Sequence, residues 1–584
     1  MPVQIQTLEQ AIRAAFPVSH LEIEDQSSGC GESYSVLLVS VAFEGKTTLA
    51  KHRLINELLK NEIAQMHAFS QTKHIAYIAS RKRLHQRNTK RTWQKPLKTN
   101  KAPVTLGDSI VKTKALKSGD IPTKSFSYDT VVKRWPIILT GIIDHLHGLN
   151  HRLTMESQRL GSEVPASAEK ITLDEKVSEG KGIIEKISRL KYRMARDHEL
   201  EPIPQDGDSY VEEYNADLAK LAQNGQNTWF TAPWLYAYRL FRAYFNETKH
   251  WRGFDPFFAQ KQDMFKNSGA AIYKIATSMY ELESERDKLK SDPSKLGILF
   301  KEMIQMCLWG NATDLSLLTH LSPSDIEHLQ TVGKDAQEAR KEFILRDDQN
   351  AVWEHIKSLE GQEKRVDFIL DNAGFELFTD FVFADFLVTY TPYASKAVFH
   401  PKLMPWFVSD VTPVDFSTTI TSLLSTSFFT TLPSAPSPTC LSHLERMVTR
   451  WKTYLNDGTF TLSTDLKETN PKAIAEFWTG PWPYWNMRER AGTIYDWLSD
   501  SGLVIFKGDL NYRKLAGDVK WPVSTPFSMA LGPLAGSFPL LSLRTNKADV
   551  AVGIPQEVAD ELDAKGEKWR VSGRYALVSF SPKC

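Results

Sequence analysis

At 584 residues and a formal net charge of +1, the chain is too long for a single hydrophobic core, and two or more domains are expected. Apolar residues make up 42% and charged residues 24%, as in ordinary globular proteins, and no apolar run approaches the roughly 18 residues that cross a bilayer. Residues 1–20 do not resemble a signal peptide. The four cysteines lie far apart and have no paired metal spacing, which fits a reducing compartment better than a disulfide framework, so we expect a protein of the cytoplasm or the nucleus that makes no membrane contact.

Residues 1–71 are predicted to form a compact αβ unit. Apolar residues recur at helical spacing from Leu8 to Phe16, which predicts an amphipathic helix. The patterns that follow predict, in chain order, strands at 21–24 and 33–40 and a helix at 48–59.

Residues 72–123 form a basic, proline-containing stretch whose acidic residues are Asp108 and Asp120. This composition suits nucleic-acid binding or a nuclear address. A solvated linker is the favoured interpretation, because charge runs are usually solvated. Nucleic acid is therefore not expected as a partner.

The rest of the chain has two patterns. Residues 124–345 show helical periodicity and predict a helical subdomain. Residues 346–584 contain short apolar runs that each end in a polar cluster, which predicts an αβα sandwich with a largely parallel sheet buried on both faces. We therefore assign the whole chain to the α/β class. The Ser/Thr/Pro-rich stretch 417–439 is expected to be a surface insertion.

Polar residues directly follow four of the apolar runs. In order, the clusters are Asp371-Asn372, Ser409-Asp410, Lys507-Gly508-Asp509 and Arg544-Thr545-Asn546-Lys547. The carboxyl ends of parallel strands meet at one edge of a sheet, and open α/β sheets bind ligands there. A single Asp at a strand end usually caps a helix or forms a turn, so it is the repetition that favours a ligand site.

Three of these side chains are hard oxygen donors: Asp371, Asn372 and Asp410. Such a set suits Mg²⁺ or Mn²⁺, with water and a substrate phosphate completing the coordination. Arg544 and Lys547 would add positive charge for the phosphate. A divalent ion and two cations together stabilise the charge on transferring phosphoryl oxygens, so these residues are suited to metal-assisted phosphoryl transfer.

Five longer motifs contain these clusters. They are Trp309–Leu315, Leu370–Glu376, Trp406–Asp410, Gly508–Arg513 and Arg544–Lys547. Through them, residues 124–584 resemble the damage-control phosphatases, and the last motif is similar to the RTxK signature of the sugar-phosphate subgroup. The resemblance implies a helical part packed on an αβα sandwich. It also implies hydrolysis of phosphomonoesters of small, reactive or damaged sugars such as fructose 1-phosphate.

The resemblance implies a metal site and a substrate site. Mn²⁺ or Ni²⁺, with Co²⁺ or Mg²⁺ as alternatives, would be bound by Asp371, Asn372 and Asp410, with Asp371 and Asp410 catalytic. Substrate contacts are implied for Asp371, Asn372, Asp509, Leu510, Asn511, Tyr512, Arg513, Arg544 and Lys547, with Lys547 on the phosphate. Weaker candidates are Glu376, Asn311 and Asp314, of which the last two equally suit a helix cap. Direct attack by Asp371 and attack by a metal-bound water both stay open, with water favoured.

One segment departs from the family pattern. Around Pro233–Arg239 the family carries about four more residues, which corresponds to about one helical turn and a rotation of roughly 40°. Weaker packing, or the loss of a carboxylate that faces the site, is therefore expected here.

The N-terminal unit contains four further motifs: Ser27–Tyr34, Phe43–Lys46, Lys51–Asn56 and Met66–Gln71. Through them it resembles a BolA-like domain that stops early, at Gln71. The resemblance implies a monothiol glutaredoxin as partner and a shared [2Fe-2S] cluster, with Cys30 and His67 as ligands. Thiolate and imidazole are suitable ligands for iron.

Two alternatives to a phosphatase remain. One is a BolA-type iron–sulfur adaptor whose C-terminal part has lost activity. The other is a protein carboxyl methyltransferase with Glu376 near the methyl donor, although no glycine-rich strand-to-helix motif indicates a nucleoside cofactor. Joining two modules of unrelated chemistry also leaves a fused gene model open.

Overall fold

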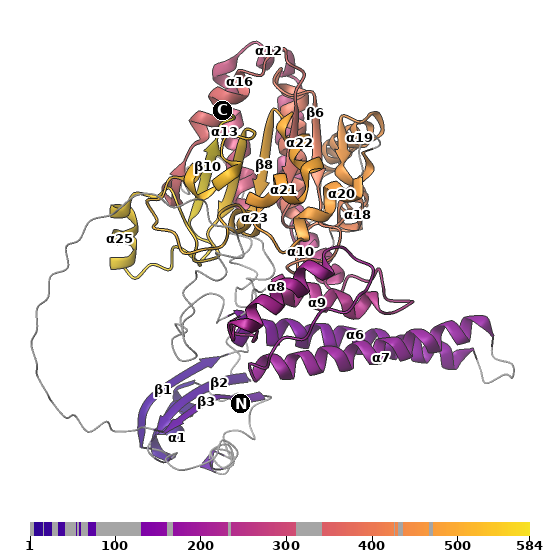
Figure 1. Ribbon diagram of the computed structural model, residues 1–584, viewed down its shortest axis with the longest axis vertical. Helices are drawn as coiled ribbons and strands as arrows, with labels where there is room; N and C mark the ends of the chain where they lie inside the picture. Colours follow the sequence, from indigo (N-terminus) through magenta and orange to yellow (C-terminus); the bar gives the residue numbers. More distant parts are fainter. Residues whose placement is uncertain are drawn as a thin grey trace, which may run out of the picture. The chain divides into compact units, whose positions relative to one another are not determined.

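The computed structural model describes most of the chain. The described residues are 5–15, 17–25, 33–40, 42, 54, 58–59, 68–76, 130–160, 167–231, 235–310, 341–425, 427–429, 436–466 and 471–584. They belong to two compact units, Met1–Asn100 and Lys101–Cys584 (Figure 1). Cys30, His67, Asn311 and Asp314 lie outside the described residues. None of the helices within the described ranges has both the length and the apolarity to cross a membrane.

The first unit contains a helix and a three-stranded sheet. Its elements are α1 (Ile5–Ala15), β1 (Val18–Asp25), β2 (Ser33–Ser40) and β3 (Ala68–Ala76). β2 lies in the middle, antiparallel to β1 and parallel to β3. Leu8 and Ile12 on α1 are fully buried, as expected of an amphipathic helix. β1 and β2 contain the two predicted strands, so the predicted helix and both predicted strands are confirmed. β3 passes through Gln71, where the sequence placed the end of the module, and most of the second expected helix lies outside the described residues.

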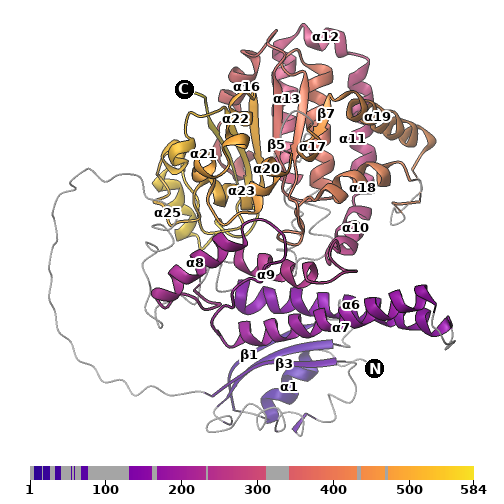
Figure 2. The same ribbon diagram turned by 45° about the vertical axis from the view of Figure 1, so that its right-hand side comes forward.

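The second unit begins with helices, as predicted. They are η2 (Thr130–Arg134), α6 (Trp135–Arg159), α7 (Ala168–Ala195), α8 (Val211–Gln223), α9 (Leu235–Asn246), α10 (Phe258–Lys266), α11 (Gly269–Glu283), α12 (Arg286–Lys290) and α13 (Pro293–Gly310). α6 and α7 lie side by side as a long hairpin (Figure 2). Trp135, Leu139, Ile142 and Leu146 recur at helical spacing along α6 and are buried, so an amphipathic stripe holds the hairpin together.

A seven-stranded sheet follows, in the order β4-β10-β9-β8-β5-β6-β7. The strands are β4 (Ile344–Asp347), β5 (Arg365–Ile369), β6 (Lys396–His400), β7 (Phe460–Leu462), β8 (Leu503–Lys507), β9 (Leu540–Thr545) and β10 (Ala576–Ser581). β9, β8, β5, β6 and β7 pair in parallel, whereas β10 is antiparallel to β9 and parallel to β4. The expected largely parallel sheet is confirmed.

Helices and turns of helix follow β4 and alternate with the later strands. They are α16 (Gln349–Lys357), α17 (Phe375–Asp385), η5 (Phe386–Tyr390), α18 (Pro413–Leu423), α19 (Pro438–Asp457), η6 (Ser463–Asp465), α20 (Pro471–Glu476), η7 (Phe477–Thr479), η8 (Tyr484–Asn486), α21 (Met487–Arg490), α22 (Gly492–Ser499), α23 (Gly508–Leu515), α24 (Phe527–Ala530), η9 (Gly532–Leu534) and α25 (Gln556–Ala564). They cover both faces of the sheet. Phe368 and Ile505 pack into a core with α13 and α17, whereas Ile369 and Phe506 pack into a second core with α22 and α23. Neighbouring strand residues point to opposite faces, which explains the continuous apolar runs.

A third core joins the helical part to the loops at the strand ends. It includes buried residues of α6 to α9 together with Trp406, Val408 and Leu510. The helical part therefore packs directly on the loops that carry the predicted site.

The segment that departs from the family pattern is well packed where the structure describes it. α9 runs without interruption, and Ala237, Tyr238 and Arg239 are buried. The Arg239 guanidinium donates two hydrogen bonds to the Asp206 carboxylate, at 2.8 and 2.7 Å. The weaker packing expected here is not observed.

The predicted surface insertion is wrong at its start, because residues 417–423 belong to the packed helix α18. Thr412 and Asp415 form a capping box at its N-terminus. Phe416, Ile420 and Leu423 are buried in the core. The serines and threonines between these apolar residues hid the helical period, since several of them bond back to the carbonyl group of the preceding turn.

Candidate active site

The order of the strands reverses between β5 and β8. From β5 the chain continues outward through β6 and β7, and it then returns to the other side of β5 for β8 and β9. Ligands of open α/β sheets bind at the carboxyl ends of the strands where the order reverses in this way. Asp371 and Asn372 follow β5, and Asp509 follows β8, so both predicted clusters lie at this point of reversal.

The loops after β5 and β6 are joined through their backbones. Asn372 and Asp410 form an isolated antiparallel bridge. The amide of Val411 donates to the carbonyl of Asp371, and the amide of Ala373 donates to the carbonyl of Ser409, both at 2.7 Å. Asp371, Asn372 and Asp410 are exposed by only 4%, 3% and 2%. The fold therefore brings the three predicted oxygen donors together.

The side chain of Asn372 is fixed in one orientation. Its Nδ2 donates to Oδ2 of Asp371 at 3.0 Å and to Oε2 of Glu376 at 2.7 Å. Its Oδ1 accepts from the hydroxyl of Ser409 at 2.5 Å. Ser409 is part of a sequence motif but had no predicted role; here it positions the amide oxygen.

Lys402, just after β6, is a site residue that the sequence did not predict. Its Nζ donates to the carbonyl of Leu370 at 2.6 Å and lies 3.7 Å from Oδ2 of Asp410. Burial lowers the pKa of Lys402, although Asp410 and Asp371 oppose this shift. The side chain thus places a buried amine beside the two carboxylates.

Glu376 belongs to a buried network beneath the oxygen donors. Nζ of Lys507 donates to Glu376 at 3.1 Å, to Asp380 at 2.7 Å and to the carbonyl of Cys307 at 3.1 Å. Burial alone would lower the pKa of Lys507, but the two carboxylates raise it. Burial raises the pKa of Asp380 to about 7. Both carboxylate oxygens of Glu376 have partners within the protein, so Glu376 fixes the position of the Asn372 amide.

This network is expected to make stability depend on pH. Between the usual pKa of 3.8 and about 7, native Asp380 keeps a proton that the unfolded chain has lost. The free energy of unfolding therefore falls as pH rises through this range, by up to about 1.4 kcal/mol per pH unit. Asp380→Asn should remove this slope, because Asn still accepts a hydrogen bond from Lys507 but does not titrate. Urea unfolding from pH 5 to pH 7 measures it, and equal slopes in the two proteins would contradict the assignment.

The polar clusters at the ends of β8 and β9 are hydrogen-bonded to each other. Oδ1 of Asp509 accepts from Nε of Arg544 at 2.7 Å and from the amide of Lys547 at 3.1 Å. Arg544 also donates to the carbonyls of Val550 and Ala548, at 2.5 and 2.9 Å, and is fully buried. Its guanidinium thus shapes the loop after β9 and positions Asp509.

The α23 residues have different surroundings. Nδ2 of Asn511 donates to carbonyls at the ends of both β5 and β8, while its Oδ1 accepts from Tyr484 at 2.7 Å and from Lys402 at 3.4 Å. Tyr512 accepts a hydrogen bond from the amide of Val552 and stacks on Phe527. Arg513 forms an ion pair with Asp518. Leu510 packs into the core of the helical part. Within α23, Asn511 therefore ties the two strand ends together.

No three or more His, Cys, Asp and Glu side chains are grouped as a metal site within the described ranges. The predicted set is instead two carboxylates and one amide oxygen. All three are hard donors that suit Mg²⁺ or Mn²⁺, and the fixed amide of Asn372 directs its oxygen away from Glu376. The residues present therefore fit a divalent ion.

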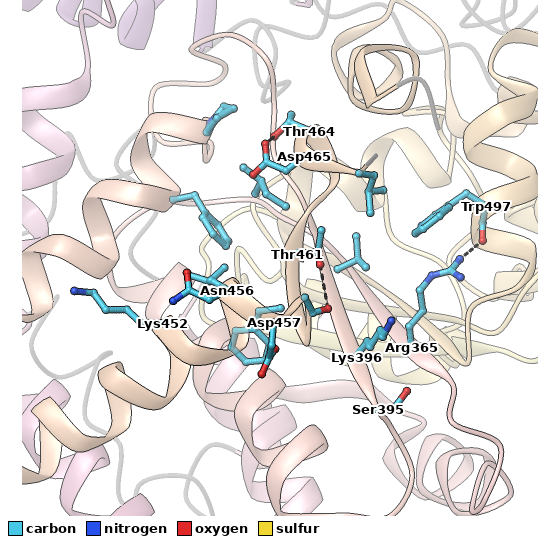
Figure 3. Close-up of a pocket in the computed structure, with 18 of the residues that line it drawn as sticks. Arg365, Ser395, Lys396, Lys452, Asn456, Asp457, Thr461, Thr464, Asp465 and Trp497 are labelled. Atoms are coloured by element: carbon cyan, nitrogen blue, oxygen red, sulfur yellow. Dashed lines mark hydrogen bonds between the residues drawn. The ribbon is translucent and has the colours of Figure 1, made fainter. Parts of the chain in front are cut away.

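A separate cavity of about 1670 Å³ lies along the edge strand β7 (Figure 3). It is lined by residues such as Lys396, Lys452, Asp457 and Thr461, and by none of the predicted site residues. The Arg365 side chain points to the carbonyl of Trp497 at its border. This cavity is distinct from the strand ends of β5 and β8 that carry the predicted site.

Residues 130–562 match the sequence model of the damage-control phosphatase ARMT1-like domain. The chain belongs to this family. Over 472 residues it is 34% identical to damage-control phosphatase ARMT1 of Danio rerio, covering 78% of this chain and 95% of that protein. The Xenopus tropicalis and human ARMT1 proteins are 35% and 30% identical, each over 78% of this chain and 96% of their own length. The resemblance to damage-control phosphatases is therefore confirmed.

Residues 12–75 match the sequence model of BolA-like proteins, so the second resemblance is also confirmed. A crystal structure of a Bol-like protein from Babesia bovis is 34% identical over 12% of this chain and 84% of its own, with a TM-score of 0.12. A DUF89 family protein from Pyrococcus horikoshii is 16% identical over 64% of this chain and 90% of its own, with a TM-score of 0.29.

Proposed function

We propose that this ARMT1-like phosphatase is a metal-dependent hydrolase of small sugar phosphates such as fructose 1-phosphate. The main support is the backbone bridge between the loops after β5 and β6, which brings Asp371, Asn372 and Asp410 together. These three residues would hold Mn²⁺ or Ni²⁺, with Co²⁺ or Mg²⁺ as alternatives. The ion would stabilise negative charge on the phosphoryl oxygens.

The protein's own groups then have separate tasks. Lys547 and Lys402 are proposed to bind the phosphate oxygens, because both are buried cations at the same edge of the sheet. Oδ1 of Asp509 accepts a hydrogen bond from Arg544, and the other carboxylate oxygen is proposed to accept a hydrogen bond from a sugar hydroxyl. Asn511 keeps the ends of β5 and β8 at a fixed separation, so that the phosphate and sugar groups would meet rigidly placed residues.

Metal removal tests this proposal. The full chain with Mn²⁺ is expected to release phosphate from fructose 1-phosphate, and EDTA should stop the release until Mn²⁺ or Ni²⁺ is restored in excess. Release that EDTA does not affect would contradict the metal site. No release from any of a panel of sugar phosphates and metals would contradict the proposed reaction itself.

A second function is proposed for the N-terminal module, because residues 12–75 match BolA-like proteins. We propose that it binds a monothiol glutaredoxin and shares a [2Fe-2S] cluster through Cys30 and His67. Co-expression should give a coloured complex with a [2Fe-2S] ultraviolet–visible spectrum, and Cys30→Ala should lose it while retaining phosphatase activity. A colourless wild-type complex would contradict this proposal.

The methyltransferase alternative has no support in the part of the chain that the structure describes. Glu376, the residue expected near a methyl donor, is fully buried against Asn372 and Lys507.

A further inference from the structure

The loop that carries Asp410 has an unusual backbone. Phe407 and Val408 have φ angles of 47° and 72°, in the left-handed region that residues with a side chain rarely adopt. A β-branched residue such as valine is especially disfavoured there, because its Cβ substituents crowd the backbone. Two consecutive residues in this state persist only where surrounding contacts hold them.

Two hydrogen bonds lie within the loop, from the amide of Ser409 to the carbonyl of Phe407 and from the amide of Asp410 to the carbonyl of Trp406, and further contacts come from the helical part of the unit. The ring of Tyr238 on α9 lies 4.2 Å from the ring of Phe407 and 5.9 Å from that of Trp406, measured between centroids. Trp135 on α6 packs on Tyr238 at 4.6 Å. Tyr238, Trp406 and Val408 are all buried. A cluster of tilted aromatic rings thus packs on the loop at the strained residue Phe407 and at its neighbour Trp406.

The same loop sets the position of the proposed metal ligands. Immediately after Val408, the Ser409 hydroxyl donates to Asn372 and the Ser409 carbonyl accepts from Ala373. Relaxation of Phe407 and Val408 to negative φ would change the direction of the chain at this point. Ser409 and Asp410 would then separate from the loop after β5.

We propose that Tyr238 is a positioning residue for the metal site. Its ring, which contacts Trp406 and Phe407, holds the loop 406–410 in the strained conformation that brings Asp410 to Asp371 and Asn372. This inference rests on the proposed function, since it concerns the same metal site. It assigns to the helical part the task of holding a proposed metal ligand in the loop after β6.

Isothermal titration with Mn²⁺ alone tests the inference in the full chain. Tyr238→Ala should weaken Mn²⁺ binding by about 10- to 100-fold, the range typical for residues that orient metal ligands. Tyr238→Phe keeps the ring, so its Mn²⁺ affinity should stay within about 2-fold of the wild type, far from the roughly 10- to 100-fold loss expected for Tyr238→Ala. Adding Val408→Gly to Tyr238→Ala should restore part of the affinity, because glycine adopts this φ without crowding.

Phe245→Ala is the matched control, because Phe245 is a buried aromatic residue of α9 that meets Phe241 edge to face and stacks on Phe254. Both alanine variants should lower the unfolding midpoint, but Phe245→Ala should bind Mn²⁺ like the wild type. Equal weakening in both would mean general destabilisation and would overturn the inference, as would unchanged binding in Tyr238→Ala.

A crystal structure of Tyr238→Ala separates this inference from the proposed function, since it needs no metal. Phe407 and Val408 should move to negative φ, and the hydrogen bond from Ala373 to Ser409 should be lost. Retention of φ near 47° and 72° at these residues would overturn the inference. A wild-type protein that binds no Mn²⁺ would instead contradict the proposed metal site.

Discussion

Asp371→Ala should abolish metal-dependent phosphate release. Asp371 supplies one of the two carboxylates that converge at the end of β5, and its loss leaves Asp410 and one amide to hold a divalent ion. We expect activity to fall by more than about 100-fold, beyond the loss typical for residues that only orient ligands. Asp371→Asn, which keeps one oxygen donor without the charge, should retain more Mn²⁺ affinity than the alanine variant. Phosphate release and Mn²⁺ titration measure the two effects.

Asp496→Ala provides the control for this experiment, because Asp496 is an exposed acidic residue on α22, outside the site. It should retain full activity. The circular dichroism spectrum of Asp371→Ala should match that of the wild type, which excludes unfolding as the cause. If Asp371→Ala keeps metal-dependent activity, Asp371 is not a ligand and the proposed site is wrong.

Lys507→Ala should produce the largest loss of stability. It leaves Glu376 and Asp380 buried without their shared cation, and both carboxylates are inaccessible to water. Removing one partner of a buried ion pair typically costs about 3–5 kcal/mol, because the remaining charge is uncompensated. The loss should be smaller in the double variant Lys507→Met/Asp380→Asn, which removes one of these charges. Chemical denaturation of the full chain measures both.

Lys565→Ala is the matched control, since Lys565 forms an exposed ion pair with Glu561 one helical turn away. Exposed pairs of this kind contribute only about 0.3–0.5 kcal/mol. A similar, small effect in both lysine variants would show that the buried network does not stabilise the fold.

The sequence predicted the sheet and the place of the site for a simple reason. Strands buried on both faces appear as continuous apolar runs, and the residues that follow parallel strands meet at one edge. This pattern alone singles out Asp371, Asn372 and Asp410 as oxygen donors at one edge of the sheet. The structure brings the loops that carry them together. The metal and the sugar substrate stay predictions, because chemically similar donor sets bind several ions.

The roles of the cations did not follow from the sequence. Arg544 was predicted to bind phosphate, and a guanidinium suits a phosphate and a carboxylate equally well. Only the structure shows that it is bound to Asp509 and to backbone carbonyls. Lys402 was not predicted, and Lys507 was named only as part of a strand-end cluster, without a role, because a lysine near a strand end usually lies in solvent.

By itself, then, the sequence determined the fold class, the family and the three oxygen donors, since all of these depend on local pattern and chain order. The tertiary structure alone decided what holds the donors in place. Tyr238 meets Phe407, and Lys507 meets Glu376, across long separations in the chain. No local pattern encodes such pairs, because they arise only when the helical part and both faces of the sheet pack around one edge.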